Sequence, residues 1–236
     1  MLKEKFTYKP LERVNIKGSL HYQTPDGQPL PSVTTVLDAL KDKTALFEWR
    51  KRVGNEEADR IMRLATGIGT QVHLHLEKFI LEEVRPNGSN LIHQMARELS
   101  EIVIDQGLSK VNEVWGTEVP LYYPGLYAGT TDCVGVWNGK PAIIDFKTTR
   151  KPKKREWIDD YFLQGAAYAE AHNEIYGTDI KTIVIMMIGW DEEADNMGNY
   201  QEFVVESDEY ERYARLWAGK VQALSLIHIS EPTRPY

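Results

Sequence analysis

Two aspartates and a lysine flank the dipeptide Asn138-Gly139, which lies between two runs rich in β-forming residues. Asn-Gly in that setting is the strongest short-range signal for a two-residue hairpin turn. Counting outward from the turn pairs Asp132 with Asp145, with the two Cβ atoms on one face about 4.5–5.5 Å apart. Lys147 falls on the same face because side chains alternate along a strand. The carboxylates repel each other unless a cation lies between them, so the group predicts metal-assisted cleavage of a phosphodiester bond.

These residues belong to a longer pattern that resembles a known family. Gly129-Thr-Thr-Asp132 and Ile143-Ile-Asp-Phe-Lys147 resemble motifs II and III of the PD-(D/E)XK nuclease superfamily. Three further matches occur in the family's order: Pro31-Ser32-Val33-Thr34, Gly69-Thr-Gln-Val-His73 and Gln164-Gly-Ala-Ala-Tyr168. The combination is similar to the RecB-like exonuclease branch, and most similar to the exonucleases of phages and of mitochondrial genome maintenance.

The resemblance implies a site in which oxygen and imidazole ligands hold a divalent cation. The implied ligands are His73, Asp132, Asp145 and the main-chain carbonyl of Phe146. Such ligands suit Mg²⁺, and the imidazole favours substitution by Mn²⁺. The catalytic residues that the resemblance implies are Asp132, Asp145, Lys147, Gln164 and Tyr168. The reaction expected is hydrolysis of a DNA phosphodiester bond.

Each part of this site also has a plainer structural interpretation. Asp-x-Lys is usually a charged strand end that meets solvent, and a lone helical histidine such as His73 is more often partly buried than a ligand. Gln164 and Tyr168 share a helix face at i, i+4 spacing, which ordinary packing against a sheet also produces. His75 points about 200° around the helix from His73 and is expected to be structural. Two glutamates are either supporting groups near the metal or surface charges: Glu77 and Glu118.

DNA binding requires a local basic surface, because the chain as a whole carries a net charge of −7. That charge argues against a protein that coats nucleic acid without specificity, but the acidic metal site accounts for part of it. The first candidates lie just after the catalytic strand: Arg150, Lys151, Lys153 and Lys154. Ser32 and Thr34 are added by their match to the exonuclease motif. Arg50-Lys-Arg52 is a second basic candidate, and a solvated loop or helix face is the alternative for either run.

Composition favours one compact enzyme domain, with 42% hydrophobic and 27% charged residues in 236. The single cysteine, Cys133, excludes a disulfide framework and the four-cysteine iron–sulfur cluster found in some RecB-like nucleases. The polar start of the chain does not resemble a signal peptide, and we expect no membrane span. We therefore expect a cytoplasmic protein of a bacterium or of a phage-infected cell. Its expected partner is DNA, single-stranded or with free ends, whereas protein partners cannot be read from the sequence.

The order of predicted elements gives an α/β (mixed α+β) fold with a restriction-endonuclease-like core. Residues 1–30 are turn-rich, and a helical N-terminal part follows at about 32–40, 44–53, 55–84 and 89–106. We expect this part to arch over the site and to carry motif I. Strands at about 111–123, 126–137 and 140–148 form a meander, followed by a helix at 157–176, strands at 182–188 and 200–205, and a helix at 208–222. The central mixed sheet is then flanked by helices.

The last residues, 224–236, resemble the translation of a sequencing-library adapter read in frame. We therefore expect one nuclease domain over residues 1–223, with about 30–106 as the helical part and 107–223 as the catalytic core. The tail is expected to carry no evolved function, and the native chain to be interrupted near Ala223.

Three functions stay open at this point. The favoured one is an exonuclease that acts on DNA ends and prefers single strands. The second is a double-strand-end exonuclease of recombination or an endonuclease of the same superfamily. The third, from another class, is a nucleic-acid-binding module that has lost catalysis. The polarity of digestion, the number of metal ions, the oligomeric state and the pathway cannot be read from these residues.

Overall fold

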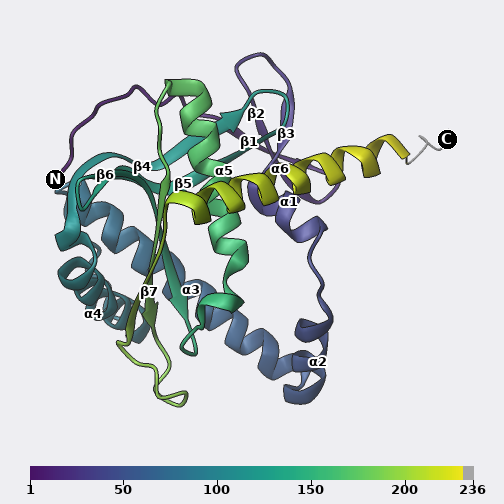
Figure 1. The fold of residues 1–236 in the computed structure, drawn as a ribbon. Coiled ribbons are helices and arrows are strands. Elements are labelled where there is room, and N and C mark those ends of the chain that lie inside the picture. Colours follow the sequence, from purple (N-terminus) through teal and green to yellow (C-terminus); the bar gives the residue numbers. More distant parts are fainter. Residues whose placement is uncertain (231–236) are drawn as a thin grey trace.

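The computed structural model describes residues 1–230, and its centre is a mixed sheet with the order β4-β5-β6-β7-β8 (Figure 1). The strands are β4 (Val111–Tyr123), β5 (Tyr127–Trp137), β6 (Lys140–Thr149), β7 (Thr182–Gly189) and β8 (Tyr200–Val205). All neighbouring pairs are antiparallel except β6 and β7, which run parallel. A parallel pair needs a crossover connection, and the helix between β6 and β7 supplies it.

Helices cover both faces of this sheet. They are α1 (Val33–Ala39), α2 (Thr44–Val53), α3 (Asn55–Ile80), α4 (Leu91–Gln106), α5 (Asp159–Tyr176) and α6 (Ser207–Ser230), with short 3₁₀ turns η1 (Leu108–Lys110) and η2 (Arg155–Trp157). One apolar cluster joins the sheet to α1, α5 and α6, and a second joins it to α3 and α4. In Figure 1, α5 and α3 accordingly lie on opposite sides of the strands. The predicted fold class is confirmed.

The hairpin that orders the site forms as the sequence predicts. Asn138 and Gly139 have φ angles of 45° and 78°, the positive values that a type I′ turn requires. Trp137 pairs with Lys140 directly beside the turn. At the other end of the crossover, α5 stops at Gly177, whose φ of 62° is the left-handed conformation common after a helix.

The structure corrects two expectations about these elements. Residues 12–31 are not merely turns: they form a three-stranded antiparallel sheet of β1 (Glu12–Ile16), β2 (Ser19–Gln23) and β3 (Pro29–Pro31). The helices follow from α1, whose start at Val33 agrees with the helix expected at about 32–40. The third helix ends at Ile80 rather than near 84, and Glu82 turns the chain with a φ of 56°.

The last helix also runs further than expected, through Ser230 instead of ending near residue 222. Leu224 is 8% exposed and belongs to the core cluster of α5 and α6. The first residue of the expected adapter tail thus packs on the domain, and residues 231–236 lie outside the described part of the chain. Over residues 1–230, no helix is long and apolar enough to cross a membrane.

Candidate active site

The two aspartates lie side by side where the hairpin ladder ends. The ladder extends outward as far as Cys133 opposite Ile144, so the next position places Asp132 beside Asp145. A hydrogen bond of 2.7 Å from the Phe146 amide to Asp132 Oδ2 holds the two strands together at that point. The register predicted from the turn therefore brings both acids to one strand end.

Lys147 contacts the second of these acids, with 2.5 Å between its Nζ and Asp145 Oδ2. Burial raises the pKa of Asp145, the Lys147 ammonium opposes that rise, and the nearby Asp132 carboxylate adds to it. Burial alone would lower the pKa of Lys147, but the two aspartates outweigh it and the pKa is raised. Lys147 is therefore a charged, protonated donor at neutral pH.

His73 reaches the same acids from α3, with its Nδ1 3.5 Å from Asp132 Oδ1. Burial lowers the pKa of this imidazole, but Asp132 outweighs that effect and the net shift is upward. Gly69 makes the approach possible: a Cβ there would lie only 3.2 Å from the Thr148 hydroxyl at the end of β6. His75 is buried on another side of α3 and accepts from Arg85 Nε at 3.3 Å, as expected for a structural histidine.

Tyr168 and Gln164 form a second contact between the family motifs. Tyr168 is 3% exposed, and a Cβ at Gly129 would lie 2.8 Å from its ring. The glycine of one motif therefore makes room for the tyrosine of another. Gln164 Nε2 donates to the Tyr168 hydroxyl at 3.4 Å, a long hydrogen bond. Tyr168 lies in the core, whereas Gln164 also lines a surface cavity.

Glu118 is the acid that the sequence analysis left undecided. Thr117 pairs with Cys133 and Val119 with Thr131, so Glu118 on β4 lies opposite Asp132 on β5. One ligand atom from each of His73, Glu118 and Asp132 fits within 4.8 Å. The signal that could have found it is the strand register, but β4 contains two irregularities that a count along the sequence cannot foresee.

The donor set fits a divalent cation. It offers hard carboxylate oxygens and one imidazole nitrogen, which suit Mg²⁺ and Mn²⁺. The buried Asp145 Oδ2 has Lys147 close by but receives no well-aligned hydrogen bond from the described residues. Lys147 compensates the buried charge only in part, because the pKa of Asp145 stays raised, and a cation would complete the compensation.

Ser32 and Thr34 lie at the start of α1, on the α5 side of the sheet. Ser32 is buried and caps the helix, because its Oγ accepts from the Thr35 amide at 2.9 Å. Thr34 instead lines a cavity of about 550 Å³ between α1, β2 and α5. The same cavity is lined by Lys41 and Tyr161 beside Gln164.

The basic run after β6 divides into paired and unpaired residues. The Arg150 guanidinium contacts Asp191 Oδ2 and lies 3.7 Å from Glu193 Oε2, so acids of the β7–β8 connection neutralise it. In the described part of the chain, Lys151, Lys153 and Lys154 pair with no acid. Lys154 Nζ lies 5.2 Å from the centroid of the Trp157 ring.

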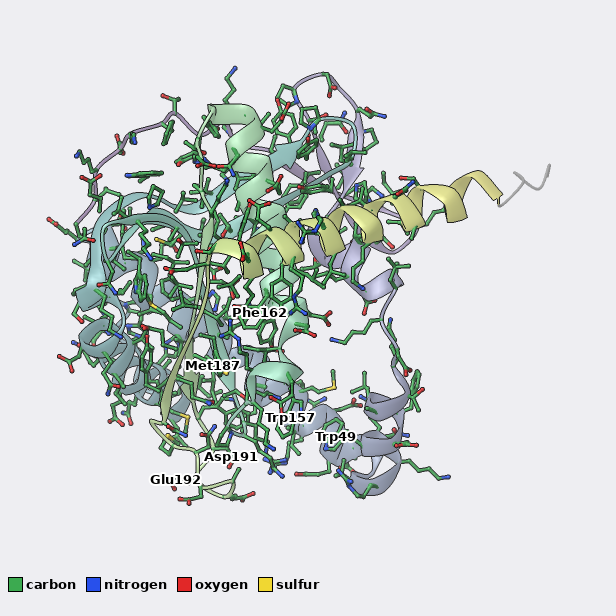
Figure 2. The ribbon with its side chains drawn as sticks, viewed as in Figure 1. Trp49, Trp157, Phe162, Met187, Asp191 and Glu192 are labelled. Carbon is green, nitrogen blue, oxygen red and sulfur yellow. The ribbon has the colours of Figure 1, made fainter. Side chains whose placement is uncertain are left out.

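One exposed aromatic side chain, Trp157, lies beside this run. Trp157 is 62% exposed, and α2 buries none of its residues, with Phe47 at 63% exposure. Figure 2 shows Trp49 on α2 and Trp157 before α5 at the same end of the molecule as Asp191. The residues Arg50, Lys51 and Arg52 lie in the last turn of α2, and Arg50 pairs with Asp59 at 2.6 Å.

Comparison with known proteins points to one group of relatives. The chain is 29% identical over 160 residues to mitochondrial genome maintenance exonuclease 1 of Xenopus tropicalis, a match that covers 61% of this chain and 43% of that protein. It is 30% identical over 157 residues to the human protein of the same name, covering 61% and 44%. The chain thus spans less than half the length of these curated relatives. No family model matches it.

Solved structures give fainter likenesses. A candidate exonuclease from Eubacterium rectale superimposes with a TM-score of 0.46 at 11% identity, covering 67% of this chain and 65% of that one. A phage-related exonuclease from Haemophilus somnus gives 0.35 at 12% identity, covering 67% and 82%. The curated relatives confirm the resemblance to PD-(D/E)XK-like exonucleases that the motifs predicted.

Proposed function

We propose that this chain is a metal-dependent deoxyribonuclease that hydrolyses phosphodiester bonds from a DNA end and prefers single strands. The observation that carries the proposal is the group at one strand end formed by the buried Asp145 with the half-buried Asp132 and Lys147. Two acids beside a protonated lysine match the needs of phosphodiester hydrolysis, where a cation and a donor must neutralise developing charge. The similarity to mitochondrial genome maintenance exonuclease 1 supports the same activity.

Different residues of the chain would bind the metal ion and the scissile phosphate. His73, Asp132, Asp145 and the Phe146 carbonyl would hold Mg²⁺, with Mn²⁺ as a substitute. A bound ion of this kind supplies Lewis-acid chemistry and lowers the pKa of water. Lys147, which lies 2.5 Å from Asp145, would hold and help to deprotonate the attacking water or stabilise the scissile phosphate oxygens.

The motif on α5 would position the substrate in two ways. Gln164 lines the cavity and can donate to a phosphate, while the buried Tyr168 fixes Gln164 by the hydrogen bond at 3.4 Å. Tyr168 is therefore a positioning residue, tied to the catalytic strand through its packing on Gly129.

A single strand would reach the site along the α1–α2 side of the molecule. Thr34 faces the cavity, and Ser32 supports it by capping α1. The lysines of the basic run, Lys151, Lys153 and Lys154, would contact phosphates. Exposed rings such as Trp157 can stack on bases, a contact worth about 1–3 kcal/mol where it forms. Arg150 contributes less, because Asp191 already neutralises it.

We further propose that residues 1–223 form one nuclease domain that processes DNA ends, as DNA repair or recombination in a bacterial or phage-infected cytoplasm requires. Digestion of duplex ends or internal cutting is the second candidate, since no residue of the site distinguishes the two strand states. A nucleic-acid-binding module without catalysis is the remaining class.

The test compares three end-labelled substrates of one sequence: linear single-stranded, linear duplex and covalently closed single-stranded DNA. The proposal expects digestion of the linear single strand with Mg²⁺ or Mn²⁺ and none with a chelator. Lys147→Ala serves as the inactive control. Rapid cutting of the closed circle would contradict the end requirement, and metal-independent or absent cleavage would contradict the function itself.

A further inference from the structure

Three acids form a row across three neighbouring strands. Glu118 on β4 lies opposite Asp132 on β5, and Asp132 lies beside Asp145 on β6. Opposite residues of antiparallel strands place their side chains on the same face, about 4.5–5.5 Å apart at Cβ. The motifs that the chain shares with nucleases account for the second and third acids but not for Glu118.

The position of Glu118 is unfavourable for an ordinary surface glutamate. Its backbone has a φ of 47°, a left-handed conformation that a residue with a long side chain rarely adopts. Within residues 1–230 its carboxylate receives no hydrogen bond and pairs with no lysine or arginine. It nevertheless stands next to the Asp132 carboxylate, and the charges of His73 and Arg13 offset that repulsion only in part.

The neighbours of Glu118 complete a chelating set. The ligand atoms of His73, Glu118 and Asp132 fit within 4.8 Å, which is the span of one small divalent ion and its donors. Of the two Asp132 oxygens, Oδ2 already accepts from the Phe146 amide, while Oδ1 is the atom 3.5 Å from His73. A second, buried acid in the row, Asp145, has an incompletely satisfied oxygen as well.

We propose that Glu118 is a ligand of the divalent cation, which it binds together with His73 and Asp132. This inference rests on the proposed function and deepens it, since it adds a third strand to the metal site. Glu118 is exposed and would be the ligand on the solvent side of the site, whereas Asp145 is buried. Removing its charge should weaken the ion's binding without disturbing the fold.

The test measures Mn²⁺ binding by isothermal titration calorimetry on the full chain, with Glu118→Gln as the variant. Gln keeps the size of the side chain and removes its charge. Glu113→Gln is the matched control, because Glu113 lies on the same strand but pairs with Lys3 at 2.7 Å, away from the acid row. Melting in a chelator is recorded for all three proteins.

Glu118→Gln should weaken Mn²⁺ binding at least tenfold, while its melting temperature in chelator stays equal or rises because a repulsion is lost. The control should bind Mn²⁺ within twofold of the unaltered chain. Equal affinity in Glu118→Gln, or a loss of the same size in Glu113→Gln, would overturn the inference. If the unaltered chain cleaves DNA, such a result leaves the proposed function intact, whereas failure to bind Mn²⁺ at all would overturn both.

Discussion

Two histidines on opposite sides of the central sheet, the buried His172 and the half-buried His73, have contrasting surroundings. His172 on α5 contacts the Tyr8 hydroxyl at 3.0 Å and the Thr178 hydroxyl at 2.8 Å, among aromatic rings. His73 on α3 instead has an aspartate 3.5 Å away, with further acids beyond it. The first imidazole finds all its partners within the chain, and the second lies in an excess of negative charge.

The contrast appears in the pKa values. Burial, with a smaller contribution from Lys5, lowers the pKa of His172 to about 4. For His73 burial acts in the same direction, but Asp132 reverses the net shift. His172 has a hydrogen-bond partner for each ring nitrogen, which indicates a structural role. His73 lies among carboxylates whose negative charge a cation would offset, which indicates a ligand site.

The largest effect is expected at the acid row itself. Asp145→Asn removes one metal ligand and should lower the rate of DNA cleavage at least about a thousandfold, or about 4 kcal/mol in the activation free energy. Single-turnover digestion of an end-labelled strand measures it. Substantial residual activity would show that the reaction does not depend on this acid.

Replacing each histidine sharpens the comparison. His73→Ala should raise the Mn²⁺ concentration for half-maximal activity about tenfold, equivalent to about 1.4 kcal/mol. The shift should be smaller for Mg²⁺, because the lost imidazole is the softer ligand. His172→Gln should leave both titrations unchanged. An unchanged metal titration in His73→Ala would remove it from the metal site.

The stability of the unaltered chain and of His172→Gln should also depend differently on pH. The pKa of His172 lies below that of the unfolded chain, so its contribution is complete above about pH 6.5 and is lost as pH falls toward 4. The unaltered chain should lose about 1–2 kcal/mol more of its unfolding free energy over that range than His172→Gln. Urea unfolding at several pH values measures the difference, and parallel curves would show that His172 does not titrate in this way.

The smallest effect concerns the basic run, where Arg150 has an acid partner and Lys153 and Lys154 have none among the described residues. Neutralising Lys153 and Lys154 together should weaken binding of single-stranded DNA and reduce the slope of log affinity against log salt by about 1.4. Arg150→Ala should change that slope little, because Asp191 neutralises Arg150 already. A larger change with Arg150 than with the lysines would reverse these assignments.

Local rules predicted the part of the site that a turn controls. The Asn138-Gly139 turn determines the register of β5 and β6, and this register alone places Asp132 beside Asp145. The sequence identifies Gly69 and Gly129 only by their match to the family motifs. Their physical reasons, the contacts of Gly69 with Thr148 and of Gly129 with Tyr168, emerge only from the packing of helices on the sheet.

Pairing between distant residues could not be predicted from the sequence either, because it too depends on how the elements pack together. Glu118 reaches the site through a strand with irregular register, and Arg150 forms an ion pair with Asp191, 41 residues away. The three strands before α1 are short, and only Tyr22 and Leu30 in them are buried, without a clear alternation. Their identity as strands depends on pairing with one another, which composition alone does not reveal.

The most direct test of the central claim is the melting temperature of the unaltered chain and of Asp145→Asn, each with a chelator and with saturating Mn²⁺. Burial raises the pKa of Asp145, so at pH 7 its charge costs stability. Asp145→Asn should therefore melt as high as the unaltered chain, or higher, in chelator. Mn²⁺ at about 100 times its Kd should raise the unaltered chain by about 5–10 °C and the variant by much less. A variant that is less stable in chelator and gains equally from Mn²⁺ would contradict the account.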